Sequence, residues 1–171
     1  KVDDHSNLLS GVTFEIRNSS GSVVDTITTN AEGVATSTVL PLGTYTVVET
    51  SVGTNTGVVI DSTPITVTLS YANQTTPVVT SAVTVSNEYQ RSNVTITKVE
   101  NDWDETFTQF NGIKLSDAII ELYAKSDIYE GSTLIYSADE LIGSEMTNAE
   151  GVATFNNLPL GQYYAKEVKS P

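Results

Sequence analysis

Residues 29–36 read Thr-Asn-Ala-Glu-Gly-Val-Ala-Thr, and residues 147–154 repeat this octapeptide without change. The tetrapeptide Leu-Pro-Leu-Gly follows each copy at the same spacing, at residues 40–43 and at residues 158–161. Two further residues recur at the same offset of 118 positions: Tyr45 and Glu49 return as Tyr163 and Glu167. The chain therefore contains two copies of one module.

The start of the module is repeated as well, at a smaller offset. Lys1-Val2 matches Lys98-Val99, which lies 97 positions further along the chain. Because the offset grows from 97 to 118 within the module, the second copy must carry insertions, which we locate around residues 103–110 and 128–142. We therefore expect two domains, at residues 1–90 and 91–171.

The composition favours an all-β protein. Thr (25) and Val (20) account for 45 of the 171 residues, and β-branched residues are enriched in strands. Alternating apolar residues between Gly, Pro and Asn turn signals predict these strands in the first module: residues 12–17, 23–28, 34–37, 44–49, 65–69 and 78–89. Six or seven strands at this spacing favour an antiparallel β-sandwich. One helical turn is predicted at residues 137–142.

The charge and the residue types exclude several classes of function. Eight Lys and Arg against 21 Asp and Glu give a net charge of −13, which disfavours binding to nucleic acid or to an anionic membrane. The chain has no cysteine and one histidine, so thiol chemistry is excluded and a Ser-His-Asp triad is disfavoured. The acidic clusters at residues 3–5 and 102–105 are interpreted as solvated loops rather than calcium sites. We expect no turnover enzyme, no metal and no cofactor.

Four polar side chains fall on predicted strand faces that are otherwise apolar: Glu49, Glu167, Asn87 and Lys98. Their companions on the same faces are Tyr45 and Val47, Tyr163 and Ala165, Val83 and Val85, and Val94 and Ile96. Unpaired buried charges cost several kcal/mol, so such residues are expected in a partnered cluster. The alternative is that each lies at a strand end and extends its polar group into water.

A lysine, a glutamate and an asparagine in one apolar core have a defined chemistry. Burial lowers the pKa of a lysine and raises that of a glutamate. The neutral amine can then attack the side-chain carbonyl of the asparagine. The protonated carboxyl can hydrogen-bond the carbonyl oxygen and shuttle protons until ammonia leaves. The product is a Lys–Asn amide that forms once per chain, which is self-modification rather than turnover.

These motifs resemble the CnaB/SpaA-type domains, the prealbumin-like repeats of Gram-positive surface adhesins and pilins. The resemblance rests on Lys-Val-Asp at the module start, the octapeptide, Leu-Pro-Leu-Gly-x-Tyr, the Glu of the next strand and Val-Ser-Asn-Glu at residues 85–88. It implies two tandem transthyretin-like, Ig-like Greek-key sandwiches with Lys–Asn isopeptide bonds. By position, it pairs Lys1 with Asn87 and makes Glu49 the catalytic residue. In module two it assigns these roles to Lys98 and Glu167.

The second module has no matching asparagine in this sequence. Asn87 follows Glu49 by 38 residues (87 − 49), whereas four residues follow Glu167 (171 − 167). The resemblance therefore implies that the asparagine partner of Lys98 lies beyond Pro171 and that the second sandwich is incomplete at its C-terminus.

The function implied by the resemblance is structural: stalk or shaft modules of a cell-wall-anchored adhesin or pilin outside a Gram-positive cell. Their partners would be further repeats of the same polypeptide. Two alternatives remain open. The first is a module that binds host extracellular matrix or glycan, through Trp103, Phe107 and Phe110 in the first insertion. The second is an accessory β-domain of a larger secreted enzyme.

Overall fold

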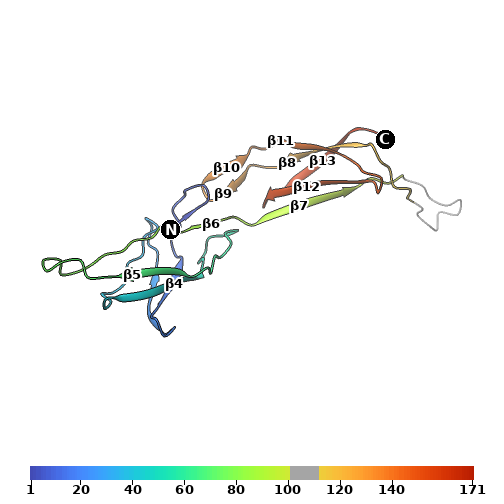
Figure 1. The fold of residues 1–171 in the computed structure, drawn as a ribbon. Helices are drawn as coiled ribbons and strands as arrows, with labels where there is room; N and C mark the ends of the chain where they lie inside the picture. The colour runs from blue at the N-terminus through green and yellow to red at the C-terminus, as the bar shows by residue number, and fades with distance from the viewer. Residues whose placement is uncertain (101–111) are drawn as a thin grey trace. The chain divides into compact units, whose positions relative to one another are not determined.

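The computed structural model describes residues 1–100 and 112–171, and the chain divides into two compact units (Figure 1). Unit 1 spans Lys1–Tyr89 and unit 2 spans Gln90–Pro171. The described residues form strands and turns but no helix, so the all-β prediction is confirmed. The helical turn predicted at residues 137–142 is wrong, because Ala138 and Asp139 form a turn that leads into a strand. No described segment is a helix of the length and apolar character that a bilayer crossing requires.

A four-stranded antiparallel sheet forms one layer of unit 1. Its order is β3-β2-β4-β5, with the bounds β2 Thr13–Arg17, β3 Val23–Thr28, β4 Gly43–Ser51 and β5 Ile65–Leu69. Phe14 and Ile16 of β2 and Tyr45 and Glu49 of β4 are buried, because alternate residues of a strand point to the same face. A short parallel ladder joins β1 (Val2–Asp3) to β6 (Ser86–Asn87).

Two strands predicted for unit 1 are largely not formed. Residues 34–37 are irregular, and within residues 78–89 only Ser86–Asn87 has strand structure. A strand requires a neighbour for its backbone hydrogen bonds. Among the described residues, no segment pairs with residues 34–37, and residues 78–89 pair with β1 and, through a single bridge at Tyr89, with Val58. The apolar alternation of these residues indicated strands, but it contained no information on whether a neighbouring strand pairs with them.

Unit 2 contains two packed sheets. One has the order β11-β8-β13 and the other pairs β12 with β7. The bounds are β7 Arg91–Thr97, β8 Ile119–Ala124, β11 Leu141–Met146, β12 Val152–Pro159 and β13 Tyr163–Lys169. Apolar side chains from both sheets form one buried cluster: Ile120, Leu122, Ala153, Phe155 and Leu158. The second insertion adds a hairpin of β9 (Ile128–Glu130) and β10 (Thr133–Tyr136).

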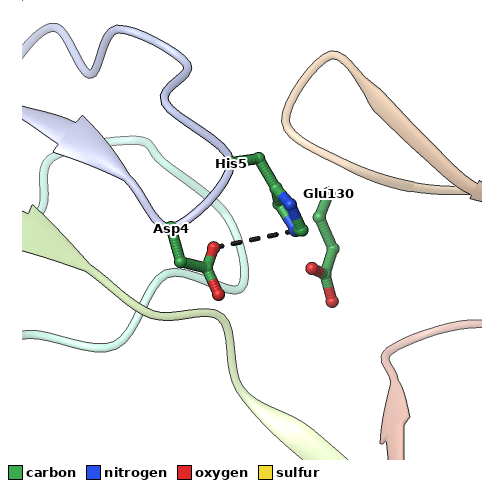
Figure 2. A group of neighbouring side chains, drawn as sticks. All are labelled: Asp4, His5 and Glu130. Atoms are coloured by element: carbon green, nitrogen blue, oxygen red, sulfur yellow. Dashed lines mark ion pairs between the residues drawn. The ribbon is translucent and has the colours of Figure 1, made fainter.

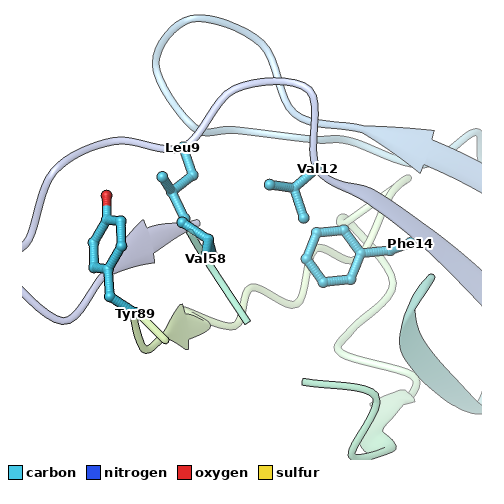
Figure 3. Close-up of a cluster of buried hydrophobic side chains, with 5 residues drawn as sticks. All are labelled: Leu9, Val12, Phe14, Val58 and Tyr89. Carbon is cyan, nitrogen blue, oxygen red and sulfur yellow. The ribbon is translucent and has the colours of Figure 1, made fainter. Parts of the chain in front are cut away.

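The buried cluster of unit 1 lies beside its first residue. Its members, which come from several separate segments, are Leu9, Val12, Phe14, Val58 and Tyr89 (Figure 3). The amine Nζ of Lys1 lies 5.9 Å from the centre of the Phe14 ring. Tyr89 follows β6 closely, so this cluster packs the two ends of unit 1 against the four-stranded sheet.

The repeated octapeptide builds the same turn in both units. Its first residue is buried: the Thr29 hydroxyl donates to the Leu9 carbonyl at 2.7 Å and accepts from the Val12 N–H at 3.0 Å. Thr147 makes the equivalent bonds in unit 2, at 2.8 Å and 3.0 Å. The glycine of the octapeptide has a positive φ in each copy, 68° at Gly33 and 70° at Gly151. A Cβ at Gly33 would collide with the carbonyl oxygen of Lys1.

We predict that Thr29→Val destabilises unit 1 by about 1–3 kcal/mol, because two buried backbone groups lose their partner and cannot reach water. Thr66→Val, on the exposed face of β5, is the control and should change stability by less than about 0.5 kcal/mol. The free energy of unfolding of both variants is measured by urea denaturation, with amide hydrogen exchange in β2 and β4 as the probe. Equal effects would contradict a structural role for the Thr29 hydroxyl.

Candidate functional site

Three segments that are distant in sequence bring Lys1, Glu49 and Asn87 together. Asn87 is in β6, which pairs in parallel with β1 directly after Lys1. Glu49 is in β4, on the inner face that it shares with Tyr45. The backbone nitrogen of Lys1 donates a hydrogen bond to the Gly33 carbonyl at 2.6 Å. This close approach is possible because residue 33 has no side chain.

The three side chains form a buried hydrogen-bonded cluster. Lys1 Nζ lies 2.9 Å from Glu49 Oε2 and also donates to Asn87 Oδ1. Asn87 Nδ2 donates to Glu49 Oε1 at 2.5 Å. The side chains of Lys1 and Glu49 are each 1% exposed. Glu49 Oε2 takes no hydrogen bond within the described part of the chain, so its charge faces only the lysine ammonium.

The position of Glu49 differs in one respect from the chemistry drawn from the sequence. We expected its carboxyl group to donate to the carbonyl oxygen of the asparagine. Instead, its two oxygens face two nitrogens, Oε2 facing Lys1 Nζ and Oε1 facing Asn87 Nδ2. The Asn87 oxygen is contacted by the lysine itself. This geometry suits a carboxylate that transfers a proton from one nitrogen to the other.

Asp3 is a buried carboxylate, so the sequence-based interpretation of residues 3–5 as a solvated loop is wrong for this residue. It is 1% exposed and pairs in register with Asn87. Its Oδ1 accepts from the backbone N–H groups of His5 and Asn7, and its Oδ2 accepts from the side chains of Asn7 and Tyr89. Burial alone would raise the pKa of Asp3, but the hydrogen bonds from Asn7, Tyr89 and His5 outweigh it and lower the pKa. Module two has an acidic residue, Glu100, at the matching position, and this repetition was the signal in the sequence that Asp3 has a structural role.

The neighbouring Asp4 and His5 form an ion pair, with 3.7 Å between Oδ1 and Nε2 (Figure 2). Glu130, drawn in the same figure, belongs to unit 2, where it is buried and pairs with Arg91. Asp4 and His5 form a turn, and the hydrogen bonds to Asp3 from the N–H groups of His5 and Asn7 hold this turn in place.

In unit 2, Lys98 and Glu167 contact each other but are not buried. Lys98 Nζ lies 2.7 Å from Glu167 Oε2, and the two side chains are 29% and 30% exposed. The sequence pattern predicted burial for both residues, so that part of the prediction is wrong. Strand alternation determines which way a side chain points, but not whether anything covers it. Among the described residues, neither side chain makes a hydrogen bond to an asparagine.

Two sequence-based proposals fall outside the described residues. The aromatic group of Trp103, Phe107 and Phe110 lies there, as does the acidic cluster at residues 102–105.

Comparisons with known proteins give one family model and several solved structures that are similar to this chain. A family model described as "SpaA: Prealbumin-like fold domain" matches residues 1–84 and 92–171. The Bacillus anthracis TIE protein is 24% identical, with a TM-score of 0.65, and the match covers 99% of this chain and 27% of that chain. A streptococcal ancillary pilin is 23% identical (TM-score 0.40), with 99% of this chain and 52% of that chain covered.

BcpA, the major pilin subunit of Bacillus cereus, is 12% identical (TM-score 0.40), with 99% of this chain and 86% of that chain covered. The search of curated proteins gives no match. The chain thus spans about a quarter of the TIE protein and about half of the ancillary pilin.

We predict that unit 1 loses stability in acid through Asp3. The pKa of Asp3 is lower in the folded chain than its ordinary value of 3.8. The ionised carboxylate therefore stabilises the fold at pH values above 3.8, and this stabilisation is lost as the pH falls through the folded-state pKa. Asp3→Asn should therefore show a weaker loss of stability than the unaltered chain between about pH 5 and about pH 2. Glu88→Gln, which removes an exposed carboxylate beside Asn87, is the control for charge. The same pH dependence in Asp3→Asn and the unaltered chain would refute the assignment.

The Lys1–Glu49 and Lys98–Glu167 pairs should contribute very different amounts to the free energy of unfolding. Glu49→Gln leaves the Lys1 ammonium buried without a counter-charge, and we expect a loss of about 3–5 kcal/mol. Glu167→Gln removes a half-exposed pair and should cost less than about 1 kcal/mol. Urea unfolding with amide exchange resolved by unit measures both losses. A small effect of Glu49→Gln would mean that water reaches the cluster.

Proposed function

The chain belongs to the SpaA family of prealbumin-like fold domains, and from that premise we propose that its two tandem domains are structural modules of a pilus or surface adhesin. We further propose that unit 1 is stiffened by an amide bond between Lys1 Nζ and Asn87 Cγ. The observation that carries this second step is the buried contact of Lys1, Glu49 and Asn87.

The reaction balances within these three side chains. Lys1 transfers a proton to Glu49 Oε2 and becomes a neutral amine. Its Nζ then attacks Asn87 Cγ, which forms the new C–N bond. The Glu49 carboxyl group turns its proton toward Nδ2, the carbonyl C=O bond re-forms, and the old C–N bond breaks as ammonia leaves. The Glu49 carboxylate then takes the second proton from Nζ, so that the products are a neutral amide, ammonia and a protonated Glu49. No oxidant, metal or cofactor takes part in this sequence.

The rate of such a reaction comes from position and burial. The reacting groups are held in contact by the β1–β6 ladder, so no bimolecular encounter is needed. The site is buried beside the Phe14 ring, which keeps water away from the reacting groups. Glu49 is accordingly the catalytic residue of unit 1. In unit 2, Lys98 and Glu167 hold the matching positions, but their side chains are 29% and 30% exposed and contact no asparagine among the described residues, so the proposed reaction is limited to unit 1.

A bond at this place suits a chain that transmits tension. It joins residue 1 to residue 87, so a pull on the two ends of unit 1 acts on a covalent link rather than on the hydrogen bonds of the sheet. The chain has no cysteine and cannot form a disulfide for this purpose. Cell-surface display on a Gram-positive bacterium and assembly with further repeats of the same polypeptide complete the proposal.

We predict that the intact mass of the chain is lower than the sequence mass by one ammonia. A proteolytic digest should contain one branched peptide that joins Lys1 to Asn87. Glu49→Gln and Asn87→Ala should keep the full sequence mass, because the first lacks the proton carrier and the second lacks the electrophile. Glu15→Gln, which removes a carboxylate paired with Arg17 elsewhere in unit 1, should retain the deficit.

Full sequence mass in the unaltered chain would rule out the bond. A deficit that persists in Glu49→Gln would leave the bond but remove Glu49 from its catalytic role.

A further inference from the structure

Residues 58–62 form a segment, which we call the strap, that runs from the end of β6 to β4. Val58 pairs with Tyr89 through an antiparallel bridge, and the Val59 N–H donates to the Glu88 carbonyl at 2.9 Å. Glu88 and Tyr89 directly follow β6, the strand that carries the proposed electrophile. The first half of the strap is therefore fixed beside that electrophile.

The second half of the strap holds Glu49 at two places. The Ser62 hydroxyl donates to the main-chain carbonyl of Glu49 at 3.1 Å. The Asp61 N–H donates to the side-chain Oε1 of Glu49 at 3.4 Å, which is a long and correspondingly weak hydrogen bond. The strap thus constrains both the backbone and the carboxylate of the residue to which we assign catalysis.

The strap also separates the reacting cluster from water. Glu49 and Asn87 are buried, and Val58 packs into the buried apolar cluster of unit 1 (Figure 3). The side chains of the next two residues, Val59 and Ile60, are exposed. One side of the strap therefore contacts the interior while the other faces solvent, so water that approaches Glu49 from this side has to displace the strap.

The hydrogen bonds of the strap make the two carboxylate oxygens of Glu49 unequal. Oε1 accepts from Asn87 Nδ2 at 2.5 Å and also from the Asp61 N–H. Oε2 accepts no hydrogen bond within the described part of the chain and faces Lys1 Nζ at 2.9 Å. Donors that contact one oxygen stabilise negative charge there, so the other oxygen is the better site for a proton. Glu49 thus turns its more basic oxygen toward the lysine.

We propose that the strap positions Glu49 for the amide-forming reaction. The Asp61 N–H and the Ser62 hydroxyl hold the carboxylate with Oε2 toward the lysine amine, while the first half of the strap keeps β6 against it. Asp61 and Ser62 are positioning residues, because their hydrogen bonds go to Glu49 and not to the atoms that form the new bond. This inference rests on the proposed function, since it concerns the rate of the same reaction.

The test measures how fast the bond forms in chains that differ at Ser62. Chains freshly translated in a cell-free system are followed by intact mass, and their folded fraction is followed by protease resistance. The rate is the appearance of the ammonia deficit per folded molecule. Ser62→Ala removes the hydroxyl, so the rate should fall about three- to tenfold, the effect expected for the loss of one hydrogen bond. Ser62→Thr keeps a hydroxyl and should restore the rate.

Two further comparisons separate positioning from a general loss of stability. Asp61→Pro removes the N–H and should slow the reaction about tenfold or more, because small displacements of a reacting group are costly. Asp61→Asn keeps the N–H and should react at the unaltered rate. Ile16→Val creates a small cavity at a buried position of β2 and should lower stability without changing the rate per folded molecule. If Asp61→Pro does not fold, the comparison of Ser62→Ala with Ser62→Thr decides the question.

Equal rates in the unaltered chain and in Ser62→Ala would overturn the inference and leave the bond itself in place. A Ser62→Thr chain as slow as Ser62→Ala would do the same. Ile16→Val slowed as much as Ser62→Ala would also overturn the inference, because the rate would then follow stability alone. Full sequence mass at every time point in the unaltered chain would instead refute the proposed bond, and this inference with it.

Discussion

The burial of one lysine charge is the constraint on which unit 1 depends. An ammonium group that is 1% exposed is tolerated only where a carboxylate and a polar acceptor meet it directly. Glu49 and Asn87 supply these groups, and other features of the unit hold them in place. Gly33 lets the chain at Lys1 pass against the octapeptide turn, and Thr29 fixes that turn to the start of β2. Asp3 anchors the next residues through Asn7 and Tyr89.

The two copies of the module show how far local sequence determines structure. The octapeptide forms the same turn in both units, because its hydrogen bonds are made within the turn and to the adjacent strand. The residues after it differ in structure despite their common start: residues 152–159 are a strand, whereas residues 34–41 are irregular. Turn chemistry is local and was readable from the sequence. A ladder requires a partner, and the partner was not visible in the pattern.

The candidate site was partly predictable for the same reason. Glu49 and Asn87 were found because each follows alternating apolar residues on one strand face. Lys1 has no preceding residues from which to judge a strand face, so only the family resemblance pointed to it. Asp3 was assigned to a solvated loop because β1 has two residues and shows no alternation that could have indicated its burial. Lys98 and Glu167 point at each other as predicted, but their exposure depends on what lies above them, which alternation does not encode.

The separation of Lys1 from Asn87 by 86 positions has a consequence for the order of events in biosynthesis. Closing so long a loop costs entropy that only the completed sheet and its buried cluster can offset. Lys1 and Asn87 therefore cannot meet until nearly all of unit 1 has been synthesised and has left the ribosome. A covalent bond between them would act as a folding checkpoint. A chain that carried it would have passed through the native arrangement, and a misfolded chain would remain chemically distinguishable from it.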